Sequence, residues 1–201
     1  MTPLPRNLPA EARRAATVDA VLDLAAGRNP GDITTAAIAQ KMGLTQGALF
    51  RHFASKEAIF AAAMETVAAR LLARVDAAAQ AAPSALAALE AVFMAHVDFV
   101  TTHPGVPRML FGELQRPGDS APKQAAQALI RQYDARLRAL LEHGRTTGEL
   151  DAALDVGAAA VLFIGSIQGL VMQSLIAGRL EQLRSAAPGV FAIYCRGIGG
   201  R

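Results

Sequence analysis

The fold is decided by the stretch ITTAAIAQKMGLTQGALFRHFASKE, residues 33–57. Threonine caps helix N-termini and glycine ends helices, so this stretch predicts two short helices joined by a glycine turn. Either of two adjacent threonines begins the first helix, which ends near Met42, before Gly43. Thr45 begins the second helix, expected over 46–53. The arrangement predicts a helix-turn-helix, a motif that places its second helix in the major groove of DNA.

Residues at the start of the second helix are the candidates for contacts with base edges. Gln46 can present its amide to adenine through two hydrogen bonds, and Ala48 can place its methyl group against thymine. Phosphate contacts are expected on both flanks, where basic side chains and free helix N–H groups favour anions. The base-contact candidates are Thr45, Gln46, Gly47 and Ala48, and the phosphate candidates are Thr34, Thr35, Arg51, His52 and Lys56.

The rest of the chain is also expected to be helical. Ala, Leu, Glu, Arg and Gln dominate, alternating β-branched residues are absent, and Gly and Pro mark the helix ends. The sequence therefore predicts an all-α fold of about nine helices, with Pro188 in the first turn of the last one. Beside the two short helices, the expected ranges are 9–26, 55–82, 84–102, 106–115, 121–147, 153–179 and 188–197.

Composition limits the classes of function. The 201 residues are 52% hydrophobic and 18% charged, which argues against disorder, and the net charge of +3 permits an anionic partner without requiring one. A single cysteine, Cys195, excludes a disulfide framework and favours a reduced cytoplasm. His96 and His103 would lie about 10.5 Å apart along a helix axis, too far to share a zinc ion. We find no catalytic motif, and we expect neither an enzyme nor a metal nor a cofactor.

One segment could also be interpreted as a membrane-spanning helix. Residues 156–178 carry no charge and are long enough to cross a bilayer. Polar side chains between Ser166 and Ser174 are costly in lipid, and no second segment of this kind occurs. The N-terminus lacks the apolar stretch of a signal peptide. We therefore expect a buried helix of a soluble, cytoplasmic protein with no membrane partner.

The helix-turn-helix region carries a family resemblance. The runs ITTAAIA (33–39), GLTQGALFRHF (43–53) and SKE (55–57) closely resemble the TetR family of bacterial transcriptional regulators. The match is dense over residues 18–60 and stands in the family's usual N-terminal position. Beyond residue 60 the resemblance is one of length, helix count and an apolar penultimate helix.

The resemblance implies an Ω-like homodimer of nine helices. Its first three helices would read DNA, and the others would bind an effector and dimerise, which implies domains at 1–54 and 55–201. His52 and Lys56 match the family pattern directly. The family usually has Tyr where this chain has Phe50, so the ring packing is kept and the phosphate-binding hydroxyl is lost. We therefore expect Phe50 to be a packing residue near the DNA backbone.

Two further sets of residues concern regulation. The C-terminal helices predict a largely apolar effector pocket, since no basic cluster is present to bind a strongly anionic ligand, although each candidate also suits an ordinary core. A GxxxG pattern lets another helix approach closely, in a dimer four-helix bundle or within the chain. The pocket candidates are Met94, Phe99, Met109, Phe111, Phe163, Gln168 and Met172, and the dimer candidates are Gly165, Gly169, Val171, Phe191 and Tyr194.

Two hypotheses about function follow from these patterns. The first is a sequence-specific DNA-binding regulator, a repressor released from a palindromic operator by an apolar small molecule. The alternative is an all-α small-molecule-binding or interaction protein whose helix-turn-helix is structural. A salt-dependent shift of DNA by the protein would discriminate between them.

Overall fold

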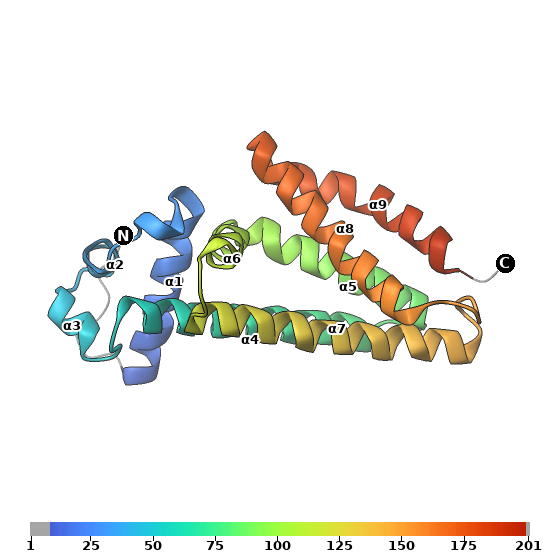
Figure 1. Cartoon of the computed structure of the whole chain (residues 1–201), viewed down its shortest axis with the longest axis horizontal. Helices are drawn as coiled ribbons and strands as arrows, with labels where there is room; N and C mark the ends of the chain where they lie inside the picture. Colours follow the sequence, from blue (N-terminus) through green and yellow to red (C-terminus); the bar gives the residue numbers. More distant parts are fainter. Residues whose placement is uncertain (1–8, 200–201) are drawn as a thin grey trace. The chain divides into compact units, whose positions relative to one another are not determined.

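The computed structural model describes residues 9–199, and this part of the chain is helical throughout. It forms nine α-helices and two 3₁₀ helices, with one isolated bridge between Leu150 and Gly199, which confirms the all-α prediction. In chain order (Figure 1) the elements are α1 (Ala10–Gly27), η1 (Pro30–Asp32), α2 (Thr35–Lys41), α3 (Gln46–Phe50), α4 (Lys56–Gln80), α5 (Ala85–Thr102), α6 (Gly105–Gln115), α7 (Ala121–Thr147), α8 (Val156–Ala177), η2 (Leu180–Gln182) and α9 (Leu183–Ile198).

The chain forms two compact units. The first unit comprises the residues up to Ala69 together with His103–Leu129, and the second comprises Arg70–Thr102 together with the residues from Ile130 onward. This division differs from the expected boundary at residue 54, because α6 returns to pack on α1.

Gly105 permits the close packing of α1 and α6. It is the first residue of α6, and a Cβ atom added to it would lie 2.2 Å from the carbonyl oxygen of Leu22 and 3.1 Å from the backbone nitrogen of Ala26. Only glycine allows such an approach without displacing one of the helices. The missing side chain therefore lets α6 join the N-terminal helices in one core.

The core of the first unit begins on α1, as the helical spacing of its apolar residues predicts. The buried residues on this stripe are Val18, Val21, Leu22 and Ala25. They are joined by the inner faces of the next helices, through Ile38, Met42, Leu49 and Phe53. α3 ends three residues earlier than expected because the chain turns after Phe50, where the N–H of His52 donates to the carbonyl of Leu49 at 3.1 Å.

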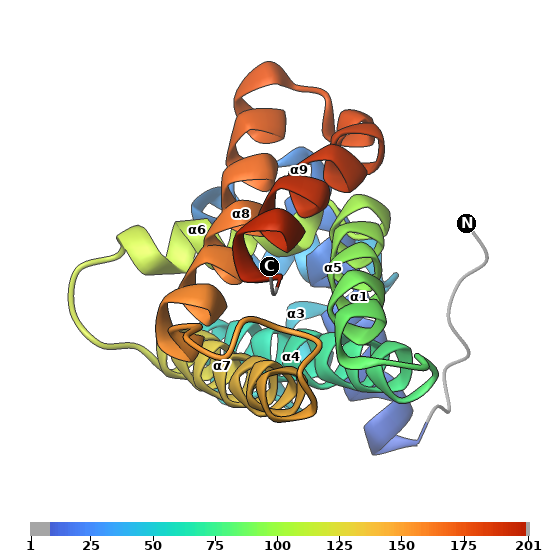
Figure 2. The same ribbon diagram turned by 90° about the vertical axis from the view of Figure 1, so that its right-hand side faces the viewer.

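The second unit packs α5, α8 and α9 together (Figure 2). The ring of Phe93 lies 5.3 Å from that of Phe163 and 5.4 Å from that of Phe191, centroid to centroid. The ring of Tyr194 lies 5.4 Å from that of Phe163, and its hydroxyl donates to the carbonyl of Ala159 at 3.1 Å. Phe191 and Tyr194, expected at a dimer interface, are thus buried in the core of a single chain.

α9 begins earlier than the sequence predicts, at Leu183 rather than at Pro188. Pro188 lies inside the helix and has no N–H to donate to the carbonyl of Arg184. Leu183 and Ala187 are fully buried, so the additional turn contributes apolar surface to the core. The prediction was wrong here because a local breaker was outweighed by tertiary packing.

α8 is apolar on two faces, which explains its uncharged sequence. One face is buried in the chain and includes Phe163, Ile167 and Val171, the last of which was also expected at a dimer interface. The other face leaves large apolar side chains exposed, Ile176 by 80%.

By length and composition both α5 and α8 could cross a membrane, and α5 carries the acidic residues Glu90 and Asp98. Both helices pack against α9.

Candidate nucleic-acid interface

Threonine caps and a glycine turn hold the two short helices of the first unit. The hydroxyl of Thr34 accepts the N–H three residues on at 3.1 Å, and that of Thr45 does the same at 3.2 Å. Of the two expected caps of α2, Thr34 is therefore the cap and Thr35 is the first helical residue. Gly43 adopts φ +67°, the left-handed conformation that favours glycine. These features confirm the helix-turn-helix prediction.

The first turn of α3 presents small and polar residues to solvent. Thr45, Gln46 and Gly47 are exposed, and Ala48 is partly exposed. The amide nitrogen of Gln46 donates to the hydroxyl of Thr35 at 3.0 Å, which joins α3 to α2. A two-bond contact with adenine uses one N–H and the carbonyl oxygen of the amide, so the second N–H of Gln46 can keep its bond to Thr35.

The turn after α3 is held by a residue that the sequence does not reveal. Phe50 leaves 45% of its surface exposed and Arg51 is also exposed, so the packing of Phe50 near the DNA backbone stays a prediction. The guanidinium of Arg14 lies 4.5 Å from the ring centre of Phe53 and donates to the carbonyl of His52 at 2.8 Å. Local sequence cannot indicate this contact, because the hydrogen bond joins residues 38 positions apart.

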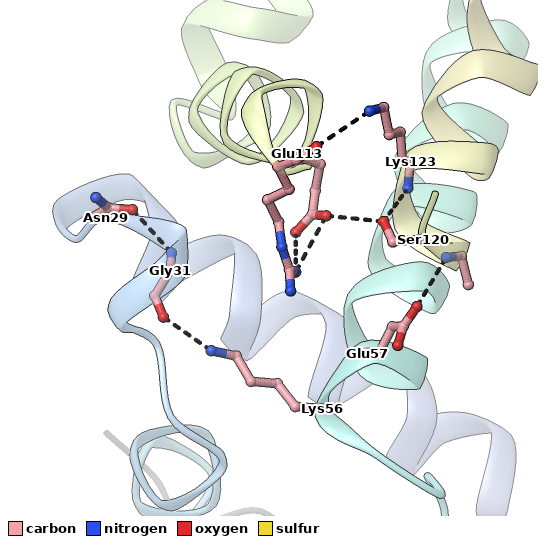
Figure 3. Close-up of polar contacts among 9 residues, drawn as sticks. Asn29, Gly31, Lys56, Glu57, Glu113, Ser120 and Lys123 are labelled. Carbon is pink, nitrogen blue, oxygen red and sulfur yellow. Dashed lines mark hydrogen bonds and ion pairs between the residues drawn. The ribbon is translucent and has the colours of Figure 1, made fainter. Parts of the chain in front are cut away.

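The first turn of α4 is tied to two other elements of the first unit (Figure 3). The ammonium of Lys56 donates to the carbonyl oxygen of Gly31 in η1 at 3.1 Å and lies 5.4 Å from the ring centre of Phe60. The carboxylate of Glu57 accepts the N–H of Ala121, the first residue of α7, at 3.0 Å. Lys56 thus stands beside η1, where its charge is available to an anion.

The interface therefore combines two chemistries that a DNA duplex requires. Small and polar groups on α3 suit contacts with base edges, and positive charge at Arg51 and Lys56 suits phosphates. The sequence profile described as Bacterial regulatory proteins, tetR family, matches residues 18–63, and that of the Tetracyclin repressor-like C-terminal domain matches residues 115–190. The chain belongs to the TetR family. It is accordingly a DNA-binding transcriptional regulator.

The chain is also similar to two nucleoid occlusion factors SlmA. The factor from Marinomonas sp. is 23% identical over 159 residues, which cover 79% of this chain and 81% of that protein. The factor from Shewanella amazonensis is 26% identical over 146 residues, which cover 72% of this chain and 74% of that protein.

Solved structures share the TetR-family fold over nearly the whole chain. The transcriptional regulator FadR from Bacillus subtilis in complex with stearoyl-CoA has a TM-score of 0.82 at 20% identity, covering 92% of this chain and 98% of that one. The fatty acid degradation regulator FadR from Bacillus halodurans has a TM-score of 0.84 at 16% identity, covering 98% of this chain and 100% of that one.

None of the seven expected effector-pocket residues of this TetR-family chain lines either of the two cavities described here. Three of them, Phe99, Met109 and Phe163, are core residues. Met94 and Phe111 are partly exposed, and Gln168 and Met172 are exposed on α8. Met109 and Phe111 belong to the first unit, and the other five belong to the second.

The second unit contains a different cavity, of about 210 Å³, lined by residues of α4, α5 and α7. Its wall is mostly aliphatic and includes the ring of Tyr133, with the ion pair of Asp76 and Arg136 (2.8 Å) also on the lining. The hydroxyl of Tyr133 lies 3.1 Å from Nδ1 of His96. Burial raises the pKa of Tyr133 and lowers the pKa of His96 to about 4, so both groups are neutral near pH 7.

The GxxxG pattern lies on the exposed apolar face of α8. A Cβ atom added to Gly165 or Gly169 would meet no atom within 4 Å, so no other described part of the chain uses the close approach that they permit. Val161, Met172 and Ile176 extend the same face. Of the five dimer-interface candidates, only the two glycines lie outside the core of the TetR-family protomer.

Proposed function

We propose that this chain is a cytoplasmic repressor that binds a palindromic operator as a homodimer and is released by a largely apolar small molecule. The observation that carries the proposal is the exposed first turn of α3, where Gln46 and its small neighbours lie between threonine caps and the basic residues Arg51 and Lys56. The experiment that tests it first is selection of DNA fragments by the purified protein, followed by titration of the selected site at several salt concentrations.

Gln46 is proposed to read a base, and Lys56 is proposed to bind a phosphate. Lys56→Ala should weaken binding to all sequences alike and reduce the log–log salt slope by about 0.9 per half-site. Lys56→Arg keeps the charge and should keep the slope. Gln46→Ala should instead cost about 1–3 kcal/mol at particular base pairs, if the contact with adenine is bidentate. Altered sequence preference in Lys56→Ala with unaltered preference in Gln46→Ala would overturn these roles.

The homodimer is inferred from the second apolar face of α8. One short helix reaches too few base edges for operator affinity, whereas a two-fold pair reads half-sites about 34–36 Å apart. Gly169→Glu introduces a charge at the centre of this face, and a Cβ atom there meets no other described part of its own protomer within 4 Å. The variant should sediment as a folded monomer, while Ala73→Glu, at an exposed position of α4, should remain a dimer. A folded, dimeric Gly169→Glu protein would contradict the assignment.

The effector is proposed to bind in the second unit, beginning at the cavity beside Tyr133. An apolar lining with a hydroxyl and one ion pair suits an apolar ligand that carries one or two hydrogen-bonding groups. Ala79 lines this cavity and Ala77 of the same helix is exposed, so Ala79→Leu should weaken ligand binding and Ala77→Leu should not. Equal ligand affinity in the two variants would place the effector elsewhere.

Release from DNA is proposed to pass through α4, which carries Lys56 at its start and cavity residues further along. A shift of this helix would change the spacing of the two recognition helices. A hundredfold loss of operator affinity needs about 2.7 kcal/mol of coupling, and reciprocity requires operator DNA to weaken ligand binding by the same factor. The test is to screen apolar compounds for a melting shift and to titrate the best one with and without operator. Equal affinity in both titrations would exclude that compound as the inducer.

A further inference from the structure

The first unit contains a cleft of its own, with a volume of about 530 Å³. It is lined by η1, the first turn of α4 and the last turn of α6, all within this unit (Figure 3). The volume lies within the range of about 300–1,000 Å³ that small-molecule sites occupy. None of the residues expected to bind an effector lines this cleft, so it is a separate feature of the chain.

Two cations line the cleft, and each has capacity for an anion. Lys56 is hydrogen-bonded to the neutral carbonyl of Gly31, and this bond uses only one of its three N–H donors. The side chain of Arg116 is 58% exposed and forms an ion pair with Glu113 through one terminal nitrogen, at 3.2 Å. The other N–H donors of its guanidinium are available for a second carboxylate or phosphate.

The two carboxylates of the cleft are already engaged. The side chain of Glu113 is 4% exposed, and it accepts hydrogen bonds from Arg116 and from the hydroxyl of Ser120 (Figure 3). One oxygen of Glu57 accepts the N–H of Ala121 at the start of α7. Both carboxylates therefore have partners within the fold, and the hydrogen-bond donors that remain for a ligand are those of Lys56 and of the exposed part of Arg116.

The remaining surface of the cleft offers apolar contacts. The rings of Pro30 and Phe60 are largely buried in the unit, and both line the cleft. Gly112 has no side chain to fill the space, and a Cβ atom at this position would lie 3.7 Å from the ring of Pro30, an ordinary contact distance. The cleft thus offers apolar rings beside positive charge, which suits a ligand with one anionic end and one apolar body.

We propose that this cleft binds a small anion, a carboxylate or phosphate ester on a compact apolar body, between Lys56 and Arg116. The apolar body packs against Pro30 and Phe60, and the anionic group takes the N–H donors that the protein leaves available. Because Lys56 is also the proposed phosphate contact, a bound anion neutralises a charge that DNA requires and weakens operator binding. This last consequence rests on the proposed function, whereas the binding site does not.

The site is tested on the DNA-free protein with 3-phenylpropionate and phenyl phosphate as probes, by calorimetric titration. The matched amine, 3-phenylpropylamine, tests the sign of the charge. Arg116→Gln should weaken binding of both anions by about tenfold or more, the loss of one charge-assisted hydrogen bond. Lys123→Gln removes the same charge from a nearby residue that does not line the cleft, and it should leave the affinity unchanged.

Gly112 supplies an independent pair of variants. Gly112→Leu fills the cleft and should abolish binding of the anions, while Gly112→Ala should retain it; thermal melts confirm that each variant is folded. Three results would overturn the site. The first is equal anion binding by Gly112→Leu and by the native protein. The second is binding of the amine by the native protein that is lost in Gly112→Leu, and the third is no saturable binding of either anion at millimolar concentration. If the anions bind but operator affinity does not fall, the link through Lys56 is refuted and the site stands.

Discussion

Replacing Gly105 by alanine should destabilise the protein and disturb the unit that reads DNA. The added Cβ atom would lie 2.2 Å from the carbonyl oxygen of Leu22, and contacts of this kind are essentially never closer than 3.0 Å. α1 and α6 must therefore separate by about 0.8 Å at this point. The atoms that the new Cβ would meet belong to the backbone of α1, so rotation of a side chain cannot relieve the clash.

The cost follows from the density of the core around the contact. Overpacking a close-packed interior costs about 1–3 kcal/mol, because neighbouring side chains shift together with the backbone. The same helix provides the control at Gly112, where a Cβ atom lies at an ordinary 3.7 Å from Pro30. Alanine has the higher helix propensity, so Gly112→Ala should stabilise the protein by up to about 1 kcal/mol.

Urea unfolding of both variants checks the prediction, with loss of stability appearing as a lower midpoint at an unchanged m-value. Operator affinity should also fall in Gly105→Ala, because α1 packs on α2 as well as on α6. A Gly105→Ala protein as stable as Gly112→Ala would refute the close approach of the two helices.

Three further predictions concern the second unit. Burial lowers the pKa of His96 from 6.5 to about 4, so below pH 6.5 the unfolded chain binds a proton that the folded chain does not. The free energy of unfolding should therefore fall as the pH drops below 6.5, by up to about 2 kcal/mol at pH 5. In His96→Gln the difference in urea midpoint between pH 7.5 and pH 5 should be smaller than in the native protein. Tyr194→Phe removes the buried hydrogen bond to Ala159 and should cost about 1 kcal/mol in the same assay, an unchanged midpoint being the contrary result. The carboxylate of Glu149 accepts the first two N–H groups of α5, and these bonds lower its pKa. Glu149→Gln should therefore melt at a lower temperature than the native protein near pH 7. The difference in melting temperature should disappear in acid, where the native carboxylate becomes protonated.

The features that the sequence could predict are local ones. Thr34, Gly43 and Thr45 act on groups within a few residues of themselves, so their roles can be read from spacing alone. The same holds for the buried stripe of α1, because helical periodicity places its members on one face. The position of α3 and the exposure of Gln46 follow from these elements.

The features that the sequence could not predict depend on distant partners. Phe191 and Tyr194 are apolar at helical spacing whether they face a second copy or their own core, and only the packing of α9 on α5 and α8 decides between them. Arg14 and Gly105 acquire their roles from residues on other helices. The local preference of Pro188 predicted that it stands in the first turn of the last helix. In the structure it lies inside α9, because tertiary packing extends this helix toward its N-terminus.

The two tyrosines have a consequence for spectroscopy. The chain has no tryptophan, and Tyr133 and Tyr194 are 2% and 3% exposed, both in the second unit. Tyrosine emission from the native protein therefore reports on the second unit alone, and the first unit is silent in this signal. Phe50→Trp would place one indole on α3, at a side chain that is 45% exposed. DNA binding could then be followed by exciting the indole at the red edge of its absorption, where tyrosine does not absorb, while tyrosine emission of the native protein follows ligand binding.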